Sequence, residues 1–142
     1  MKRNATAVWK AGLKDGQGTL TTESGVLDHA QYSFTTRFES GKGTNPEELI
    51  AAAHAGCFSM ALAAQLEKEG MKAEEIKTTA AVSLEKSDAG FSIPSIHLTV
   101  EATIPGAELH SFEKAANSAK ENCPVSKLMN ASITMDAKLI SQ

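Results

Sequence analysis

Hydrophobic and polar residues alternate along two neighbouring stretches of this chain, at residues 76–85 and 96–102. Such alternation is typical of strands that bury one face and expose the other. Residues 87–90 read as the turn between them, so we expect an antiparallel pair. A third alternating stretch at 131–139 predicts another strand near the end of the chain.

The first 45 residues combine β-forming side chains with glycines, which indicates short strands joined by turns. We expect a hairpin made by residues 6–10 and 19–22, with its turn at 16–18. A third strand is expected at 32–38, followed by a glycine-containing loop at 39–45.

A long, nearly uncharged run from Leu49 to Leu66 comes next, and strong helix-start signals precede it. Asn45 can cap a helix and Pro46 suits its first position. The acidic pair Glu47 and Glu48 complements the helix dipole in the first turn. The predicted helix reaches about Lys68 and stops before Gly70.

This helix is apolar on nearly every side, which favours a central helix over a surface helix. Its length is near the lower limit for a membrane span, but its alanine-rich composition and His54 favour a buried helix. The strands of one subunit cover only part of such a helix. We therefore expect a homodimer with a twofold interface.

Two shorter helices are expected near the end of the chain. Apolar residues at helical spacing between Leu109 and Ala119 predict the first. Pro124 opens the second, which reaches about Met129. The predicted class is α+β, with antiparallel strands around a central helix, in a single domain over residues 1–142.

The composition narrows the possible partners and compartment. The net charge of −3 gives no basic excess for nucleic acid or a membrane surface. No apolar segment follows the basic residues near the N-terminus, so we expect no secretory signal and a cytoplasmic location. A persistent disulfide is unusual in that compartment, whereas a transient one is common in redox catalysis.

The chain has two cysteines, Cys57 and Cys123, in different local settings. Cys57 lies deep in the predicted central helix, beyond the reach of the helix dipole, so a cationic side chain must activate it. Cys123 lies at a helix start, where the dipole does act. Local physics alone would favour Cys123 as the nucleophile, and the choice stays open at this point.

The best candidate for the cation is Arg37, which comes shortly before the capped helix. A guanidinium can hold a thiolate and a peroxide oxygen together, and a carboxylate can orient it. Either Glu47 or Glu48 is placed to do so.

Several separated segments resemble the OsmC/Ohr family, and the position of Arg37 before the helix favours its OsmC branch. They agree in order and spacing over nearly the whole chain. The matching segments are residues 22–27, 34–39, 43–62, 82–91 and 123–126.

The resemblance implies an intertwined α+β homodimer that reduces organic hydroperoxides and hydrogen peroxide through two cysteines. By position, Cys57 is then the peroxidatic cysteine, Cys123 the resolving cysteine, and Arg37 and Glu47 the supporting pair. An external dithiol reductant is implied, and no cofactor or metal. The family's name also implies a link to osmotic stress.

Helix geometry adds an expectation about the dimer. Glu47 and Cys57 lie about 15 Å apart along one helix. One Arg37 would struggle to reach both within a subunit, so we expect composite sites in which arginine and glutamate of one chain approach the cysteine of the other.

The same residues allow other interpretations. A metal site using His54 and Cys57, with Cys123 and Glu47, is disfavoured because paired ligand spacing is missing. His54 is expected to be a partly buried core or interface residue. The alternatives to a peroxidase are a non-enzymatic dimer that binds an apolar small molecule and a thiol redox sensor.

Overall fold

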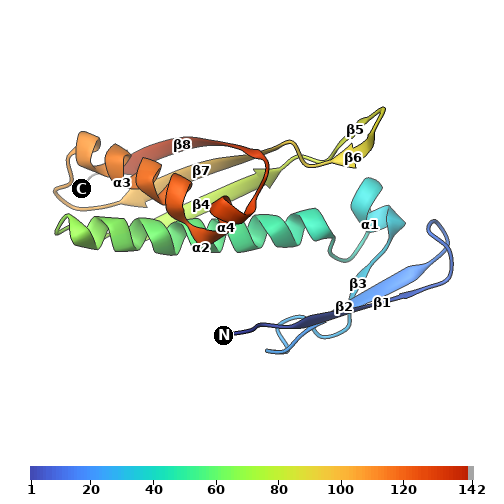
Figure 1. Cartoon of the computed structure of the whole chain (residues 1–142). Coiled ribbons are helices and arrows are strands. Elements are labelled where there is room, and N and C mark those ends of the chain that lie inside the picture. The colour runs from blue at the N-terminus through green and yellow to red at the C-terminus, as the bar shows by residue number, and fades with distance from the viewer. Residues whose placement is uncertain (141–142) are drawn as a thin grey trace. The chain divides into compact units, whose positions relative to one another are not determined.

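A computed structural model describes residues 1–140, which belong to two compact units, one of residues 1–49 and one that begins at Ile50. The long helix α2, Pro46–Lys68, begins in the first unit and continues through the second. The single domain over residues 1–142 stays a prediction. The predicted α+β class is confirmed by the order of strands and helices (Figure 1).

The first unit contains an antiparallel sheet of three strands in the order β1-β2-β3. The strands are β1 (Ala5–Lys10), β2 (Gln17–Thr22) and β3 (Ala30–Tyr32). The predicted hairpin is confirmed, because β1 pairs with β2. Its turn lies earlier than predicted, since Gly18 is already paired with Trp9.

The predicted strand at residues 32–38 is wrong, because β3 ends at Tyr32 and a short helix follows, α1 (Phe34–Phe38). The reason is a capping box at Ser33. The Ser33 hydroxyl accepts from the Thr36 backbone N–H at 3.3 Å, and the Thr36 hydroxyl oxygen accepts from the Ser33 N–H at 2.8 Å. Arg37 therefore lies on a helix rather than on a strand.

The loop between α1 and α2 is hydrogen-bonded to β3 and to α1. The Thr44 N–H donates to the Gln31 carbonyl at 2.9 Å, and the Asn45 amide donates to the Thr36 carbonyl at 3.0 Å. Gly43 has φ +127°, and a Cβ there would lie 2.4 Å from the Gln31 carbonyl oxygen. Only glycine fits this close approach.

Helix α2 is confirmed over Pro46–Lys68. The Asn45 side-chain oxygen accepts from the Glu48 N–H at 2.8 Å, which is the predicted cap. At the other end the Met71 N–H donates to the Leu66 carbonyl, and Gly70 takes the left-handed conformation typical of a helix end.

One face of α2 is buried and the opposite face is exposed. The expectation that one subunit covers only part of this helix is therefore confirmed. By length and hydropathy α2 could also span a membrane, although its buried face belongs to the core of the second unit. The buried residues of this face are His54, Phe58, Leu62 and Leu66, and the exposed ones of the opposite face are Ala52, Ala53, Gly56, Met60 and Ala64.

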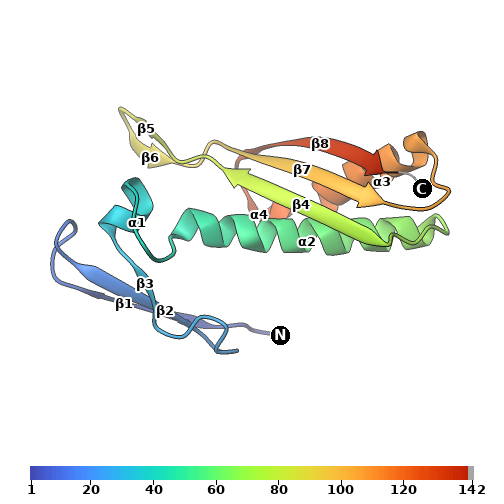
Figure 2. The same ribbon diagram turned by 180° about the vertical axis from the view of Figure 1, so that it is seen from behind.

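The second unit contains a sheet in the order β4-β7-β8 and a separate hairpin (Figure 2). The sheet strands are β4 (Glu75–Val82), β7 (Ser95–Thr103) and β8 (Ser132–Ile140). The hairpin consists of β5 (Glu85–Ser87) and β6 (Gly90–Ser92). The predicted antiparallel pairing of the two middle strands is confirmed.

The pairing of β7 with β8 is parallel, which corrects the expectation of antiparallel strands throughout. Helices α3 (Leu109–Asn122) and α4 (Pro124–Leu128) connect the two strands. This connection returns the chain to the end where β7 began, and a crossover through a helix is what parallel neighbours require.

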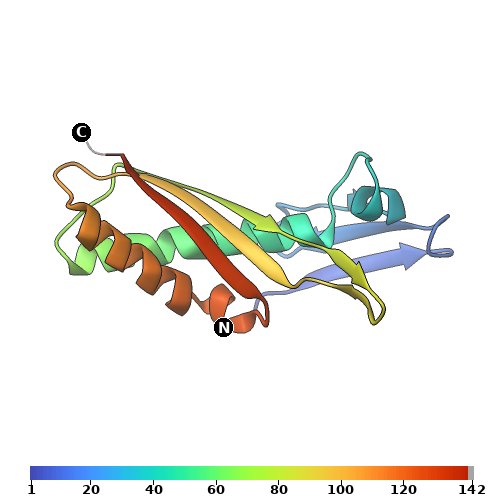
Figure 3. The same ribbon diagram turned by 90° about the horizontal axis from the view of Figure 1, so that it is seen from above.

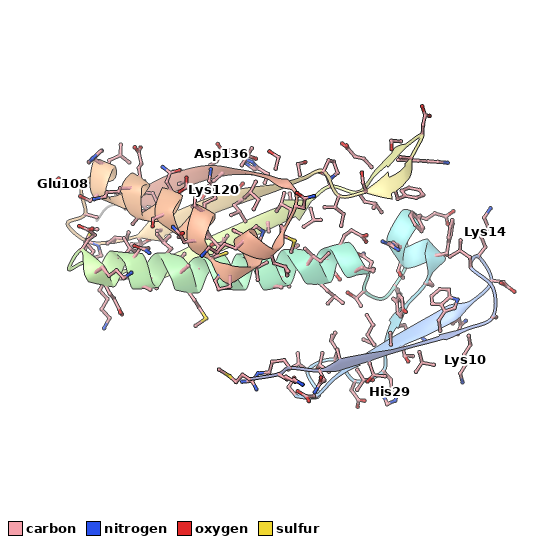
Figure 4. The ribbon with its side chains drawn as sticks, viewed as in Figure 1. Lys10, Lys14, His29, Glu108, Lys120 and Asp136 are labelled. Carbon is pink, nitrogen blue, oxygen red and sulfur yellow. The ribbon has the colours of Figure 1, made fainter. Side chains whose placement is uncertain are left out.

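Helices α2 and α3 cover one face of this sheet (Figure 3). The alternate residues of β7 that face them are fully buried, as the alternation predicts. The other face is open, and Asp136 of β8 points away from the helices (Figure 4). The core residues from the sheet and α3 are Ile96, Leu98, Val100, Ala102, Phe112, Ala116 and Ala119.

Candidate active site

The first unit brings together Arg37 and Glu47, two of the residues singled out from the sequence. Nε and Nη2 of Arg37 both donate to Glu47 Oε1, at 3.1 and 2.8 Å. The arginine side chain is 39% exposed and the glutamate side chain 10%. A guanidinium held at two nitrogens by one buried carboxylate has a fixed orientation and keeps donors free for another anion.

Glu47 rather than Glu48 orients the arginine. The Glu48 carboxylate is exposed and accepts from the Thr44 hydroxyl at 2.7 Å. Glu47 Oε2 is buried and has no hydrogen-bond partner among residues 1–140. This oxygen therefore keeps its capacity to accept one more hydrogen bond.

A largely apolar pocket of about 270 Å³ lies beside Arg37 in the first unit. Aromatic side chains dominate its wall, and the Trp9 and Tyr32 rings contact each other there. The pocket offers a hydrophobic molecule a surface with one charged group at its edge. Its lining, besides Arg37, includes Trp9, Leu13, Tyr32, Phe34, Phe38 and Pro46.

The second unit brings the two cysteines together. Cys57 is half-buried on α2, Cys123 is fully buried before α4, and both are free thiols. The two thiols are near enough for Cys123 to act on the pKa of Cys57, and the backbone N–H of Val125 also lies near the Cys57 sulfur. Two neighbouring thiols on separate elements of one core are the arrangement from which a disulfide can form.

Burial raises the pKa of the Cys57 thiol above its ordinary value. The Val125 N–H opposes this shift, and the neighbouring Cys123 side chain adds to it. Within residues 50–140 no lysine or arginine contributes to the pKa of Cys57. The second unit by itself therefore favours the neutral thiol form of Cys57 near pH 7.

Cys123 lies beside two polar groups that sequence reasoning did not connect with it, Ser126 and His54. The Ser126 N–H donates to Cys123 Sγ at 3.3 Å, and the Ser126 hydroxyl lies 3.1 Å from the same sulfur. The same hydroxyl lies 2.8 Å from His54 Nε2. His54 is fully buried rather than partly buried, and burial lowers its pKa.

The contact between Ser126 and Cys123 could have been predicted from the sequence. Cys123 caps α4, and a cap side chain meets the third residue of its helix. Nothing in the sequence linked His54 to Ser126, which is 72 positions away. Among residues 1–140, no group of three or more His, Cys, Asp or Glu side chains gathers in a way that could hold a metal ion.

The four predicted site residues thus occur as two pairs, Arg37 with Glu47 in the first unit and Cys57 with Cys123 in the second. A carboxylate-oriented guanidinium can stabilise a developing oxyanion. A pair of contacting thiols can be oxidised to a disulfide and reduced again.

Known proteins resemble the chain over nearly its full length. It is 50% identical over 139 residues to peroxiredoxin OsmC of Escherichia coli, covering 98% of this chain and 97% of that protein. It is 29% identical over 123 residues to the organic hydroperoxide resistance protein OhrB of Bacillus subtilis, covering 86% and 88%. The higher identity to OsmC agrees with the predicted branch.

A solved structure has the same fold. It is the organic hydroperoxide resistance protein OsmC of Legionella pneumophila, with a TM-score of 0.66, 26% identity and 96% of each chain covered. Residues 39–138 match the family model described as OsmC-like protein. This match and the relatives show that the chain belongs to the OsmC-like protein family.

Proposed function

We propose that this protein is a cysteine-dependent peroxidase that reduces organic hydroperoxides, and hydrogen peroxide, to alcohols or water. The observation that carries this proposal is the proximity of Cys57 and Cys123, two free thiols on different elements of one core. The names of the relatives support it, since they include a peroxiredoxin and organic hydroperoxide resistance proteins.

In the proposed cycle, the Cys57 thiolate attacks one oxygen of the peroxide. The O–O bond breaks, an alkoxide leaves and takes a proton, and Cys57 becomes a sulfenic acid. Cys123 then attacks the oxidised sulfur, water leaves, and a disulfide forms. An external dithiol restores both thiols by exchange.

Arg37 has two roles in this cycle. Its guanidinium lowers the pKa of the attacking thiol, which burial otherwise raises, and it stabilises charge on the departing oxygen. Glu47 holds the guanidinium in place through two hydrogen bonds. Ionising an ordinary thiol completely gains about 30-fold in thiolate at pH 7, and the gain is larger for Cys57 because burial raises its pKa. Stabilising the departing oxygen adds to this gain.

The pocket beside Arg37 is suited to the organic part of the substrate. Its aromatic wall offers apolar contacts, and the charged group at its edge attracts the polar peroxide end. Bulky apolar hydroperoxides should therefore have a lower KM than hydrogen peroxide.

The active form is a homodimer with composite sites. The exposed face of α2 supports this, because Gly56 has open space around it and Met60 is 78% exposed. Strand β1 is exposed along its whole length, which also fits an uncovered surface in the single chain. A second copy would cover these surfaces and carry Arg37 and Glu47 of one chain to Cys57 of the other. We place the protein in the cytoplasm, with neither nucleic acid nor membrane as partner.

The test is peroxide consumption by the purified protein with a dithiol reductant. Cys57→Ser should abolish consumption, and Cys123→Ser should consume about one equivalent and then stop at the sulfenic acid. After one equivalent of alkyl hydroperoxide, the intact mass of the wild-type protein should fall by two hydrogens. Oxidation without repeated turnover would favour a redox sensor, and indifference to both substitutions would favour a binding protein.

A further inference from the structure

A continuous chain of hydrogen bonds runs from His54 through Ser126 to Cys123. His54 Nε2 lies 2.8 Å from the Ser126 hydroxyl oxygen, which lies 3.1 Å from Cys123 Sγ. His54 and Cys123 are fully buried, and Ser126 is 7% exposed. The chain therefore connects the second thiol to an imidazole nitrogen inside the core.

We propose that His54 and Ser126 form a proton relay that ionises Cys123 for the disulfide-forming step. This inference rests on the proposed peroxidase cycle and concerns its second half. Ser126 acts on the reacting sulfur directly, whereas His54 acts through Ser126 and is a positioning and proton-holding residue.

The relay balances the step without another reactant. The Cys123 thiol proton passes to the Ser126 oxygen while the Ser126 hydroxyl proton passes to His54 Nε2. The resulting thiolate attacks the Cys57 sulfenic sulfur, an S–S bond forms, and the S–O bond breaks. The departing hydroxide receives the proton back from His54 through Ser126 and leaves as water, so Cys57 is reduced while Cys123 is oxidised.

A purely structural role explains this arrangement poorly. His54 Nδ1 is buried with no hydrogen-bond partner among residues 1–140, and an unmatched polar atom in a core is costly. A leucine or phenylalanine would fill the space without that cost. Helix capping explains the contact between the Ser126 N–H and Cys123, but not the one between the Ser126 hydroxyl and His54.

The protonation state of His54 suits a proton acceptor. Burial lowers its pKa, so the ring is neutral at pH 7 and one nitrogen can accept. With the ring proton on Nδ1, the Nε2 lone pair faces the Ser126 hydroxyl. The same burial makes the protonated ring return its proton readily.

The test follows the two chemical steps separately. Reduced protein is mixed with one equivalent of tert-butyl hydroperoxide and quenched at intervals with dimedone, which tags sulfenic acid. Intact mass then separates tagged protein from disulfide. Ser126→Ala and His54→Gln should each slow disulfide formation at least about 10-fold and let sulfenic acid accumulate. The double variant should be no slower than the slower single variant, because the two groups act as a unit.

Ser59→Ala is the matched control. It removes another core-side serine hydroxyl of the second unit, which lies 2.7 Å from the Thr78 hydroxyl, and should form disulfide at the wild-type rate. Disulfide formation at the wild-type rate in Ser126→Ala and His54→Gln would overturn the relay, as would additive losses in the double variant.

A measurement on the wild-type protein covers the case in which a variant does not fold. In D2O, disulfide formation should slow, and its rate should depend on the deuterium fraction along a curve, because more than one proton moves. A linear dependence or no effect would overturn the relay. If the wild-type protein gives neither sulfenic acid nor disulfide, the proposed function fails as well.

Discussion

At the scale of single residues, Glu47 and Glu48 differ sharply although they are neighbours. Glu47 is buried against Arg37, whereas Glu48 is exposed and accepts a hydrogen bond from the Thr44 hydroxyl. In Glu47→Gln the guanidinium loses its charged partner, so kcat/KM for an alkyl hydroperoxide should fall about 10- to 100-fold. Glu48→Gln should stay within about 2-fold of wild type. Equal losses in steady-state assays of the two variants would contradict the assigned roles.

The sequence singled out Arg37, Glu47, Cys57 and Cys123 as candidate site residues. Their separation along the chain explains which of their contacts could be predicted. Arg37 and Glu47 are separated by one short loop, so local capping signals already limited their distance. The contact from Ser126 to His54 joins an element at the end of the chain to α2, and it depends on packing that no local pattern records.

At the scale of elements, helix signals were more reliable than strand signals. Asn45 and Pro46 marked the start of α2 and Gly70 its end, because caps are local interactions. Residues 32–38 are rich in aromatic and β-branched side chains, which favour a strand, whereas the Ser33 capping box starts a helix. The antiparallel prediction for β7 and β8 overlooked the helices between them, which allow the crossover that parallel neighbours require.

The loop between α1 and α2 is the element that fixes Glu47 relative to Arg37. Gly43→Ala should lower the free energy of unfolding by about 1–3 kcal/mol, because its Cβ would lie 2.4 Å from the Gln31 carbonyl oxygen at a φ of +127°. Peroxidase activity should fall with it, since the loop would have to shift.

Gly25→Ala is the control for this substitution. Gly25 has φ +77° with nothing within 4 Å of the added Cβ, so the cost should be about 1 kcal/mol and activity should persist. Urea denaturation and steady-state assays of both variants would measure the difference. Equal costs in the two variants would mean that the close approach to Gln31 does not matter.

At the scale of the whole molecule, the proposed mechanism requires the Arg37–Glu47 pair and the Cys57–Cys123 pair to act on the same substrate. Within residues 50–140 no basic side chain lowers the pKa of Cys57, and burial raises that pKa. The exposed alanine face of α2 leaves room for another helix to approach closely. In the dimer that we propose, a second copy of the chain would cover this face of α2 and bring the positive charge to Cys57.

Mixed dimers test this arrangement directly. Arg37→Gln and Cys57→Ser homodimers should each lose at least about 100-fold in kcat/KM. Co-expression with two different affinity tags would allow the mixed dimer to be purified.

If each site takes Arg37 from one chain and Cys57 from the other, one site of the mixed dimer has both residues intact and the other site carries both substitutions. The mixed dimer should then recover about half of the wild-type activity per dimer. If each site lies within one chain, every site in the mixed dimer has a lesion and activity should stay at the level of the variants. A purified mixed dimer that carries both tags and remains inactive would therefore rule out composite sites.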